Sequence, residues 1–132
     1  KIIKIIKILK KNKIRTSLFI EPKISDVLLA KKINSDCIEI HTGKYCNLIN
    51  KNKRSEAEFL KIKKAASYAY NIGLEVHAGH GLTYVSAKKI SKIKTISELN
   101  IGHFLVSESL FDGLKKTIKN FKRIINRWKY LV

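Results

Sequence analysis

The sequence predicts an α/β fold in the form of half a (β/α)8 barrel, and two observations lead to that prediction. Short apolar runs alternate with helical segments four times, without a hairpin signal, which is the pattern of a parallel sheet with crossover helices. The predicted strands begin near residues 16, 37, 74 and 98, and these spacings bracket the roughly 30 residues per unit of an eight-unit barrel of about 250 residues. An open four-stranded sheet has the same order of elements but leaves two edges unpaired.

The N-terminal residues predict an amphipathic helix. Its apolar positions follow the i, i+3, i+4, i+7 spacing of one helix face, namely Ile2, Ile5, Ile6 and Leu9. We expect this face to pack on the sheet, because alternating strands and helices follow it. The alternative is a basic amphipathic helix that lies on a membrane surface.

Two strands with a helix between them come next. Residues 16–20 form a short apolar and aromatic run that ends before Pro22, as expected for a strand. Ser25 is a suitable N-cap for the helix that follows. Residues 37–41 predict the second strand, and a polar loop is expected from its end through residue 52.

The second half of the chain continues the alternation. A longer helix has one apolar face, formed by Phe59, Ile62, Ala66 and Ala69. Gly73 stands where a glycine C-cap is expected, before a third strand over residues 74–78. A short helix around Ile90 and Ile93 precedes the fourth strand, residues 98–101. The last helix carries apolar residues at helical spacing, namely Leu110, Leu114, Ile118, Phe121, Ile125 and Trp128.

The charge of the chain is strongly positive, with 28 lysines and arginines, 10 acidic residues and a formal net charge of +18. Only four of the basic residues are arginines, the side chain that best suits phosphates and guanine edges. We therefore expect lysines on solvated helix faces and no specific nucleic-acid partner, although such a charge attracts polyanions without sequence preference. No run approaches the roughly 18 uninterrupted apolar residues of a membrane helix, so a membrane-spanning protein is excluded.

The two cysteines and the missing methionine bear on where the chain functions and whether it is complete. Cys37 and Cys46 lack a CxxC or cysteine–histidine metal spacing, and no signal peptide precedes them. Reduced thiols in the cytoplasm are therefore expected. The chain of 132 residues has no methionine, even at position 1, and we expect it to be a piece of a longer protein.

The chemistry is expected at the carboxyl ends of the strands, because loops and helix N-termini converge there in parallel α/β folds. Glu39 and His41 are two positions apart on one strand, so both side chains point to the same face, which would be the barrel interior. The two groups can exchange protons or orient a polar substrate. The alternative is a hydrogen-bonded pair that only satisfies itself.

Glycine–histidine pairs mark the exits of the third and fourth strands. His80 lies between Gly79 and Gly81, where backbone can approach a ligand closely and an imidazole can transfer protons near neutral pH. Gly102 and His103 occupy the place where the last strands of a barrel commonly bind phosphate through backbone N–H groups. No metal site is expected, because the nearby histidines lack a fixed carboxylate ligand.

Four segments together resemble the pyridoxine 5′-phosphate synthase family, which has a (β/α)8 barrel fold. The likeness runs in order over nearly the whole chain, and the segments lie at matching spacing. They are Ser17-Leu18-Phe19-Ile20, Ile38-Glu39-Ile40-His41-Thr42-Gly43-x-Tyr45, Ala78-Gly79-His80-Gly81-Leu82-Thr83-Tyr84 and Glu98-Leu99-Asn100-Ile101-Gly102-His103. The resemblance implies that residues 1–132 form a single partial domain, strands five to eight in the C-terminal half of the barrel, with the N-terminal half absent.

The resemblance also implies an activity and a set of site residues. The family condenses 3-amino-2-oxopropyl phosphate with 1-deoxy-D-xylulose 5-phosphate to pyridoxine 5′-phosphate, phosphate and water, in a route to vitamin B6. His80 matches a catalytic histidine that donates or accepts a proton, and Glu39 matches a carboxylate that stabilises transition states. Gly81, Gly102 and His103 match positions that bind 3-amino-2-oxopropyl phosphate. The implied partners are these small phosphorylated substrates and a homo-oligomer, an octamer in the family, with no metal or organic cofactor.

The chain departs from the family pattern in three respects. This chain lacks the family motifs of the first half of the barrel, which are the Asn-x-Asp-His motif of the first strand and the histidine, arginine and glutamate of the next strands. We therefore expect the isolated chain to be inactive. His77 replaces a usual asparagine. Glu108 stands where arginine is usual, beside the expected phosphate loop, and a carboxylate there repels phosphate unless it turns away. The alternatives are a non-catalytic remnant and a basic module that binds polyanions.

Overall fold

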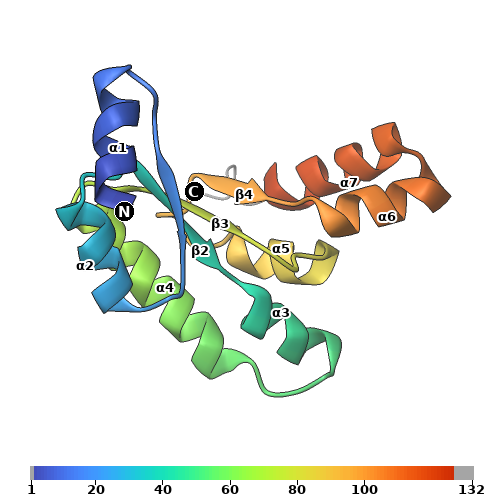
Figure 1. Ribbon diagram of the computed structural model, residues 1–132. Coiled ribbons are helices and arrows are strands. Elements are labelled where there is room, and N and C mark those ends of the chain that lie inside the picture. The colour runs from blue at the N-terminus through green and yellow to red at the C-terminus, as the bar shows by residue number, and fades with distance from the viewer. Residues whose placement is uncertain (1, 127–132) are drawn as a thin grey trace.

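The computed structural model describes residues 2–126, which form a parallel sheet and its connecting helices (Figure 1). The four strands lie in the order β1-β2-β3-β4. Their bounds are Ser17–Ile20 for β1, Cys37–His41 for β2, Glu75–Gly79 for β3 and Glu98–Asn100 for β4. The helices are α1 (Ile2–Lys11), α2 (Ile24–Lys32), α3 (Gly43–Asn50), α4 (Glu56–Asn71), α5 (Tyr84–Ile90), α6 (His103–Asp112) and α7 (Leu114–Asn126).

This arrangement confirms the predicted α/β class. Strands that follow one another in the chain are neighbours in the sheet, and every neighbouring pair is parallel. Each predicted strand begins within one residue of the observed one. Parallel neighbours joined by helices are the repeating unit of a (β/α)8 barrel, so the sheet has the architecture of part of such a barrel.

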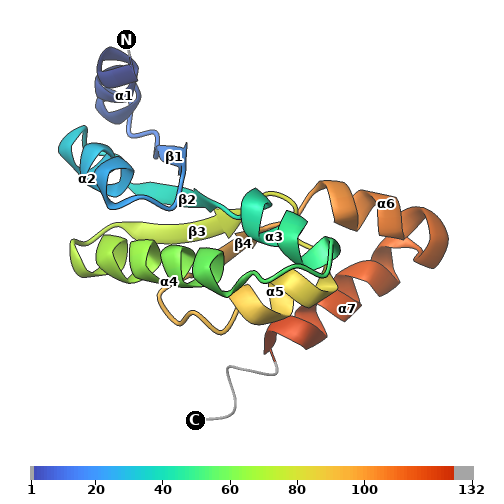
Figure 2. The same ribbon diagram turned by 90° about the horizontal axis from the view of Figure 1, so that it is seen from below.

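The two faces of the sheet differ in chemistry. One face packs against the helices through Ile38, Ile40, Val76 and Ala78, each at most 1% exposed. Helix α4 runs along this side of the sheet (Figure 2) and adds Ile62, Ala65, Ala66 and Ala69 to the core. The alternate strand residues point to the opposite face, where the register aligns Phe19, Glu39 and His77 across three strands. This opposite face is polar, and at its carboxyl edge lies the candidate site.

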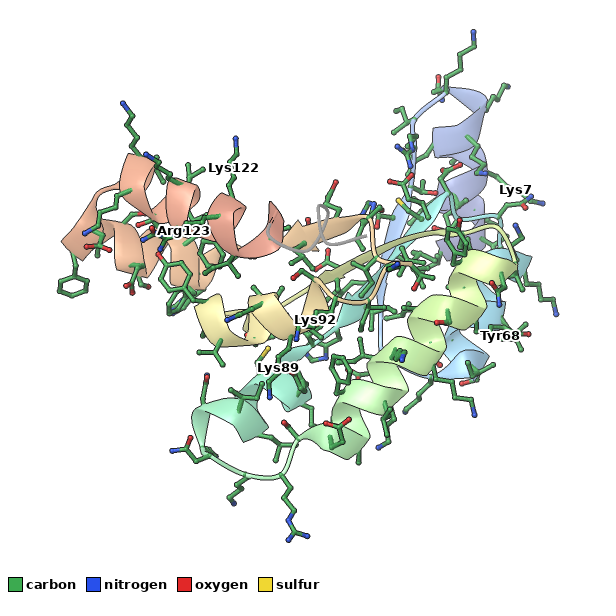
Figure 3. All side chains as sticks on the ribbon, turned by 180° about the vertical axis from the view of Figure 1, so that it is seen from behind. Lys7, Tyr68, Lys89, Lys92, Lys122 and Arg123 are labelled. Atoms are coloured by element: carbon green, nitrogen blue, oxygen red, sulfur yellow. The ribbon has the colours of Figure 1, made fainter. Side chains whose placement is uncertain are left out.

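The predicted placement of lysines on solvated helix faces agrees with the structure. Lysines lie on the outer surfaces of the helices, as Lys7 of α1, Lys89 of α5 and Lys122 of α7 illustrate (Figure 3), and all three are exposed. Cys37 and Cys46 are both buried and unpaired with each other. Within residues 2–126, no helix combines the length and the apolar character needed to cross a bilayer.

Helix α1 forms as predicted but packs differently. Only Ile6 is buried, while Ile2 and Ile5 are about half exposed. The buried side of α1 forms a groove together with the C-terminal end of α2, including Leu29 and Ile33. The expectation that the apolar face of this helix packs on the sheet is therefore wrong for most of that face.

The expected cap of α2 is also wrong. Helix α2 begins at Ile24, one residue before Ser25, and its N-cap is Lys23 in an extended conformation. The amide of Lys23 donates to the carbonyl of Glu21 at 2.7 Å, forming a tight turn around Pro22. Because this turn redirects the chain at once, the helix begins before a side-chain cap is reached, and the Ser25 hydroxyl donates to Asp26 instead.

The expected polar loop after β2 contains a helix, α3. It carries the polar residues Lys44, Asn47 and Asn50, while Tyr45, Leu48 and Ile49 lie at the i, i+3, i+4 spacing of one helix face. Tyr45 and Cys46 are nevertheless only 1% exposed and attach the helix to the core. The apolar spacing is thus that of a helix, although over only eight residues, and the expectation of a loop is wrong.

The expected last helix is two helices, α6 and α7. Gly113 separates them with a φ of 80°, a conformation that glycine adopts readily and that ends a helix. Leu110 consequently lies at the end of α6 and is 82% exposed, whereas Phe121 of α7 is buried against the ring of Tyr84. Trp128, also assigned to this helix from the sequence, lies outside the described residues.

Candidate active site

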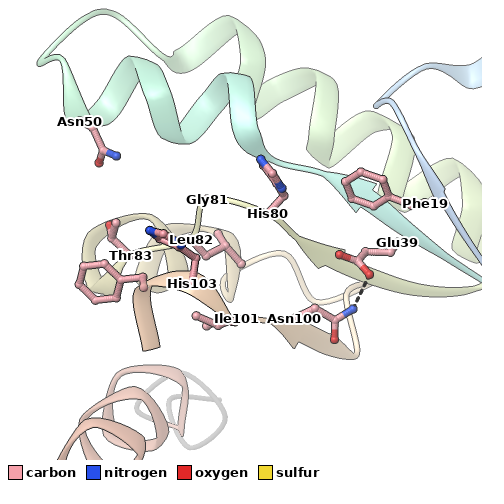
Figure 4. A pocket seen from close by; sticks show the side chains of 12 residues that line it. Phe19, Glu39, Asn50, His80, Gly81, Leu82, Thr83, Asn100, Ile101 and His103 are labelled. Atoms are coloured by element: carbon pink, nitrogen blue, oxygen red, sulfur yellow. Dashed lines mark hydrogen bonds between the residues drawn. The ribbon is translucent and has the colours of Figure 1, made fainter. Parts of the chain in front are cut away.

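A cavity of about 750 Å³ lies at the carboxyl ends of the strands (Figure 4). All five residues that the family resemblance assigns to the site line it, namely Glu39, His80, Gly81, Gly102 and His103, whereas His41, also singled out from the sequence, does not. The remaining lining residues are Phe19, Asn50, Leu82, Thr83, Asn100, Ile101 and Phe104. Parallel strands end at the same edge of a sheet, which explains why residues so far apart in the chain meet here. The roles of the five residues remain predictions.

Glu39 is held by a strand that is not its neighbour. Asn100 Nδ2 on β4 donates a hydrogen bond to Glu39 Oε2 on β2 at 2.7 Å, although β3 lies between them (Figure 4). The bond passes over Gly79, where a Cβ would overlap with Glu39 Oε1 and lie 3.0 Å from the Cβ of Asn100. Glycine is therefore required at this position of β3. Within residues 2–126 no donor bonds Glu39 Oε1, which leaves this oxygen available to a ligand.

His80 has an unusual backbone conformation. Its φ is 77°, a left-handed conformation that costs a non-glycine residue about 1 kcal/mol or more. The fully buried Thr42 hydroxyl lies 2.8 Å from the carbonyl oxygen of Gly79 and 2.7 Å from that of His80, and it donates to this pair. Such strain persists where surrounding structure holds it, and it is typical of functional sites.

Two rings flank the imidazole of His80. The His41 ring meets it edge-on, with centroids 4.8 Å apart, and the Phe19 ring lies 6.3 Å away. His41 Nδ1 is 2.6 Å from Glu21 Oε1. Glu39 and His41 are thus not the self-satisfied pair considered from the sequence, because each bonds a residue of a different strand or strand end.

The start of α6 provides hydrogen-bond donors at the rim of the cavity. The first amide to donate within this helix is that of Val106, to the Gly102 carbonyl at 3.0 Å, so the three amides before it have no intrahelical acceptor. Free N–H groups and the helix dipole together favour a bound phosphate. A Cβ built on Gly102 has nothing within 4 Å, so the backbone here borders open space. Glu108, the charge reversal noted in the sequence, does not line the cavity.

The groups behind the cavity wall are neutral. Cys46 lies beneath Gly81, and burial raises the pKa of its thiol, so it stays protonated near neutral pH and is a poor nucleophile. Burial also raises the pKa of Tyr45 to about 12. In the described part of the chain, no three His, Cys, Asp or Glu side chains are grouped so as to hold a metal ion. The residues that line the cavity offer two imidazoles, those of His80 and His103, the carboxylate of Glu39 and backbone donors.

Comparison with known proteins identifies the relatives of this chain. The family model described as pyridoxal phosphate biosynthesis protein PdxJ matches residues 1–127. The chain belongs to the PdxJ family. It is 54% identical over 127 residues to the pyridoxine 5′-phosphate synthase of Pelagibacter ubique (strain HTCC1062) and 48% identical over 120 residues to that of Sulfurihydrogenibium sp. (strain YO3AOP1). It is 45% identical over 113 residues to the pyridoxine 5′-phosphate synthase of Zymomonas mobilis subsp. mobilis.

These PdxJ relatives are longer than this chain. The three alignments cover 96%, 91% and 86% of this chain, but 53%, 49% and 43% of the relatives. The chain therefore spans about half the length of the curated PdxJ proteins that it matches.

Sequence reasoning assigned no role to three residues that shape this PdxJ site. Asn100 holds Glu39, Thr42 holds the backbone of His80, and Phe19 forms part of the wall. Asn100 lies in register with Gly79, so it faces the same side of the sheet as Glu39. The role of Asn100 could have been predicted from one feature of the sequence, namely an asparagine on the inner face of a strand that lies opposite a glycine of the next strand.

Proposed function

We propose that this chain supplies strands five to eight of a pyridoxine 5′-phosphate synthase, as one partial domain of a (β/α)8 barrel. The reaction is the condensation of 3-amino-2-oxopropyl phosphate with 1-deoxy-D-xylulose 5-phosphate to pyridoxine 5′-phosphate, phosphate and water, a step in vitamin B6 synthesis. The observation that carries the proposal is the convergence of Glu39, His80 and the start of α6 on one cavity. Membership of the PdxJ family supports it.

In this proposal each group has a chemical task. His80 transfers a proton during condensation, since an imidazole nitrogen can donate or accept a proton and this side chain is exposed at the cavity. Glu39, fixed by Asn100, stabilises positive charge that develops during ring formation. Gly81, Gly102 and His103 bind 3-amino-2-oxopropyl phosphate, with backbone amides of α6 as donors to the phosphate. The reaction requires no metal or organic cofactor.

The proposal divides the catalytic machinery between two halves of the barrel. The described residues offer the imidazoles of His80 and His103 and the carboxylate of Glu39 to the cavity. The sheet has two edges, β1 and β4, to which further strands can add. We assign the other catalytic groups to a first half that completes the barrel, so the isolated chain does not turn over. A homo-octameric assembly and a cytoplasmic location belong to the same proposal.

The test joins this chain to the first half of the Pelagibacter ubique relative, either as a fusion or by co-expression. We call this combination the assembled enzyme. Both phosphorylated substrates are supplied, and pyridoxine 5′-phosphate is measured by its ultraviolet absorbance after separation. Turnover is expected from the assembled enzyme and not from either half alone.

Two results would contradict the proposal. Turnover by the isolated chain would show that the catalytic groups are not divided between halves. A correctly folded assembled enzyme that binds neither substrate would remove the proposed function altogether. Steep, salt-sensitive binding of nucleic acid by such a protein would favour the polyanion-binding alternative instead.

A further inference from the structure

Three consecutive strand ends bring a carboxylate and two imidazoles into one row. Glu21 follows the last residue of β1, His41 ends β2, and His80 follows the last residue of β3. Glu21 Oε1 lies 2.6 Å from His41 Nδ1, and the ring centroids of His41 and His80 are 4.8 Å apart. Of these three residues, only His80 lines the 750 Å³ cavity.

The contact with Glu21 fixes the ring of His41. A carboxylate accepts from an imidazole N–H, so Nδ1 of His41 carries a proton and the ring cannot flip without losing a charge-assisted bond. The opposite edge of the ring, Nε2, faces Gly43, where a Cβ would come within 2.6 Å. The contact with Glu21 holds one edge of the His41 ring, and the lack of a side chain at Gly43 leaves room for the other edge.

The fixed ring of His41 in turn bounds the space of His80. The two rings meet at 72°, and Cδ2 of His80 would lie only 2.8 Å from a Cβ at Gly43. Thr42 holds the backbone of His80 from the same stretch of chain. The tripeptide at residues 41–43 therefore acts on both the backbone and the ring of His80, with no contribution of its own to the cavity wall.

We propose that Glu21 and His41 are positioning residues, which hold the imidazole of His80 in the orientation that transfers the proton. This inference rests on the proposed function, because the orientation of His80 matters only if His80 reacts. Small displacements of a reacting group lower the rate steeply, by as much as about 100-fold for about 1 Å. Loss of the Glu21 carboxylate is therefore expected to affect the rate of the chemical step.

The competing explanation is a surface ion pair that only stabilises the fold. The Glu21 side chain is 51% exposed and that of His41 is 26% exposed, and pairs so accessible to water contribute little to stability. A purely stabilising role thus predicts almost no effect of Glu21→Gln. A positioning role predicts a loss of rate without a matching loss of stability, which separates the two explanations.

The kinetic test uses Glu21→Gln, Glu21→Asp and His41→Asn in the assembled enzyme. Asp112→Asn is the matched control, because Asp112 forms an exposed ion pair with Lys116 at 2.8 Å on α6 and α7, away from the cavity. We expect kcat of Glu21→Gln and His41→Asn to fall about 10-fold with KM changed less than about twofold. Glu21→Asp is expected to recover most of the rate, and the melting temperature of Glu21→Gln should match that of Asp112→Asn.

A spectroscopic measurement keeps the inference separate from the proposed function. In protein labelled with ¹⁵N-histidine, the Nδ1 proton of His41 is expected as a slowly exchanging signal that Glu21→Gln abolishes. The ring signals of His80 should then broaden or split, as its imidazole samples more than one orientation. If turnover is absent altogether, the proposed function fails while this measurement still decides whether Glu21 fixes His80.

Two outcomes would overturn the inference. Unchanged kcat and unchanged His80 signals in Glu21→Gln would show that the pair does not position His80. If kcat and the melting temperature fell together, and by similar amounts in Glu21→Gln and Asp112→Asn, the pair of Glu21 and His41 would only stabilise the fold.

Discussion

The side-chain amide of Asn100 reaches across an entire strand to bond the carboxylate of Glu39 at 2.7 Å. The two residues belong to β4 and β2, and the strand between them offers only the bare backbone of Gly79 at the crossing point. The orientation of Glu39 therefore depends on three strands at once. This relationship is the basis of the first prediction.

Gly79→Ala should separate Glu39 from Asn100. The added methyl group overlaps with Glu39 Oε1 and contacts Asn100, so the bond breaks or the strands move apart. In the assembled enzyme we expect kcat to fall at least 10-fold and the free energy of unfolding to fall by about 1–3 kcal/mol, as overpacking usually costs. Asn100→Ala removes the same bond without a clash. If Gly79→Ala retained the wild-type rate, the orientation of Glu39 would not matter for catalysis.

Gly102→Ala should separate substrate binding from folding. The φ of Gly102 is −106°, and a methyl group there meets no atom within 4 Å, so the folded protein should tolerate alanine. We expect an unchanged melting temperature but a KM for 3-amino-2-oxopropyl phosphate raised about 10-fold, because the methyl group occupies space that the phosphate needs. Equal KM values for the wild type and Gly102→Ala would mean that the phosphate does not bind beside Gly102.

His80 should show a trade-off between stability and activity. Glycine relieves the strain of a φ of 77°, so His80→Gly should stabilise the protein by about 1 kcal/mol in urea unfolding, whereas His80→Ala retains the strain. Both variants should lose about 100-fold or more in kcat, the usual contribution of a general acid–base group. A variant that kept the wild-type kcat would exclude His80 from the mechanism.

Asp36 should make the stability of the chain depend on acidic pH. A hydrogen bond of 2.8 Å from the backbone N–H of Thr16 holds the pKa of Asp36 below its usual value of 3.8, and Lys10 adds to this effect against the opposing effect of burial. The folded state thus favours the charged carboxylate. The contribution of Asp36 to the free energy of unfolding is complete above pH 3.8. It is lost as the pH falls through the lower pKa that Asp36 has in the folded protein.

The measurement compares urea unfolding of the wild type and Asp36→Asn between pH 6 and pH 2. The wild type should be more stable near neutrality, and the difference should shrink as the pH falls below 3.8. A difference that stayed constant over this range would mean that charge on Asp36 contributes nothing.

The sequence predicted the strands well because their signals are local. Apolar runs end at glycine or at Pro22, and these breaks place the strand boundaries within one residue. The cavity followed from topology, since the carboxyl ends of parallel strands must meet. The contact between Glu39 and Asn100 did not follow, because it depends on register across an intervening strand. The break at Gly113 was also missed, because the apolar residues on either side of it continue in helical phase.

The two edge strands of the sheet, β1 and β4, have a consequence for how this polypeptide associates with other chain segments. Backbone N–H and C=O groups along the outer sides of β1 and β4 have no ladder partner within residues 2–126. Such edges recruit any extended peptide nearby, including the same strand of another molecule. Each edge strand of the described sheet is therefore a template on which further extended chain can pair, from the same polypeptide or from another.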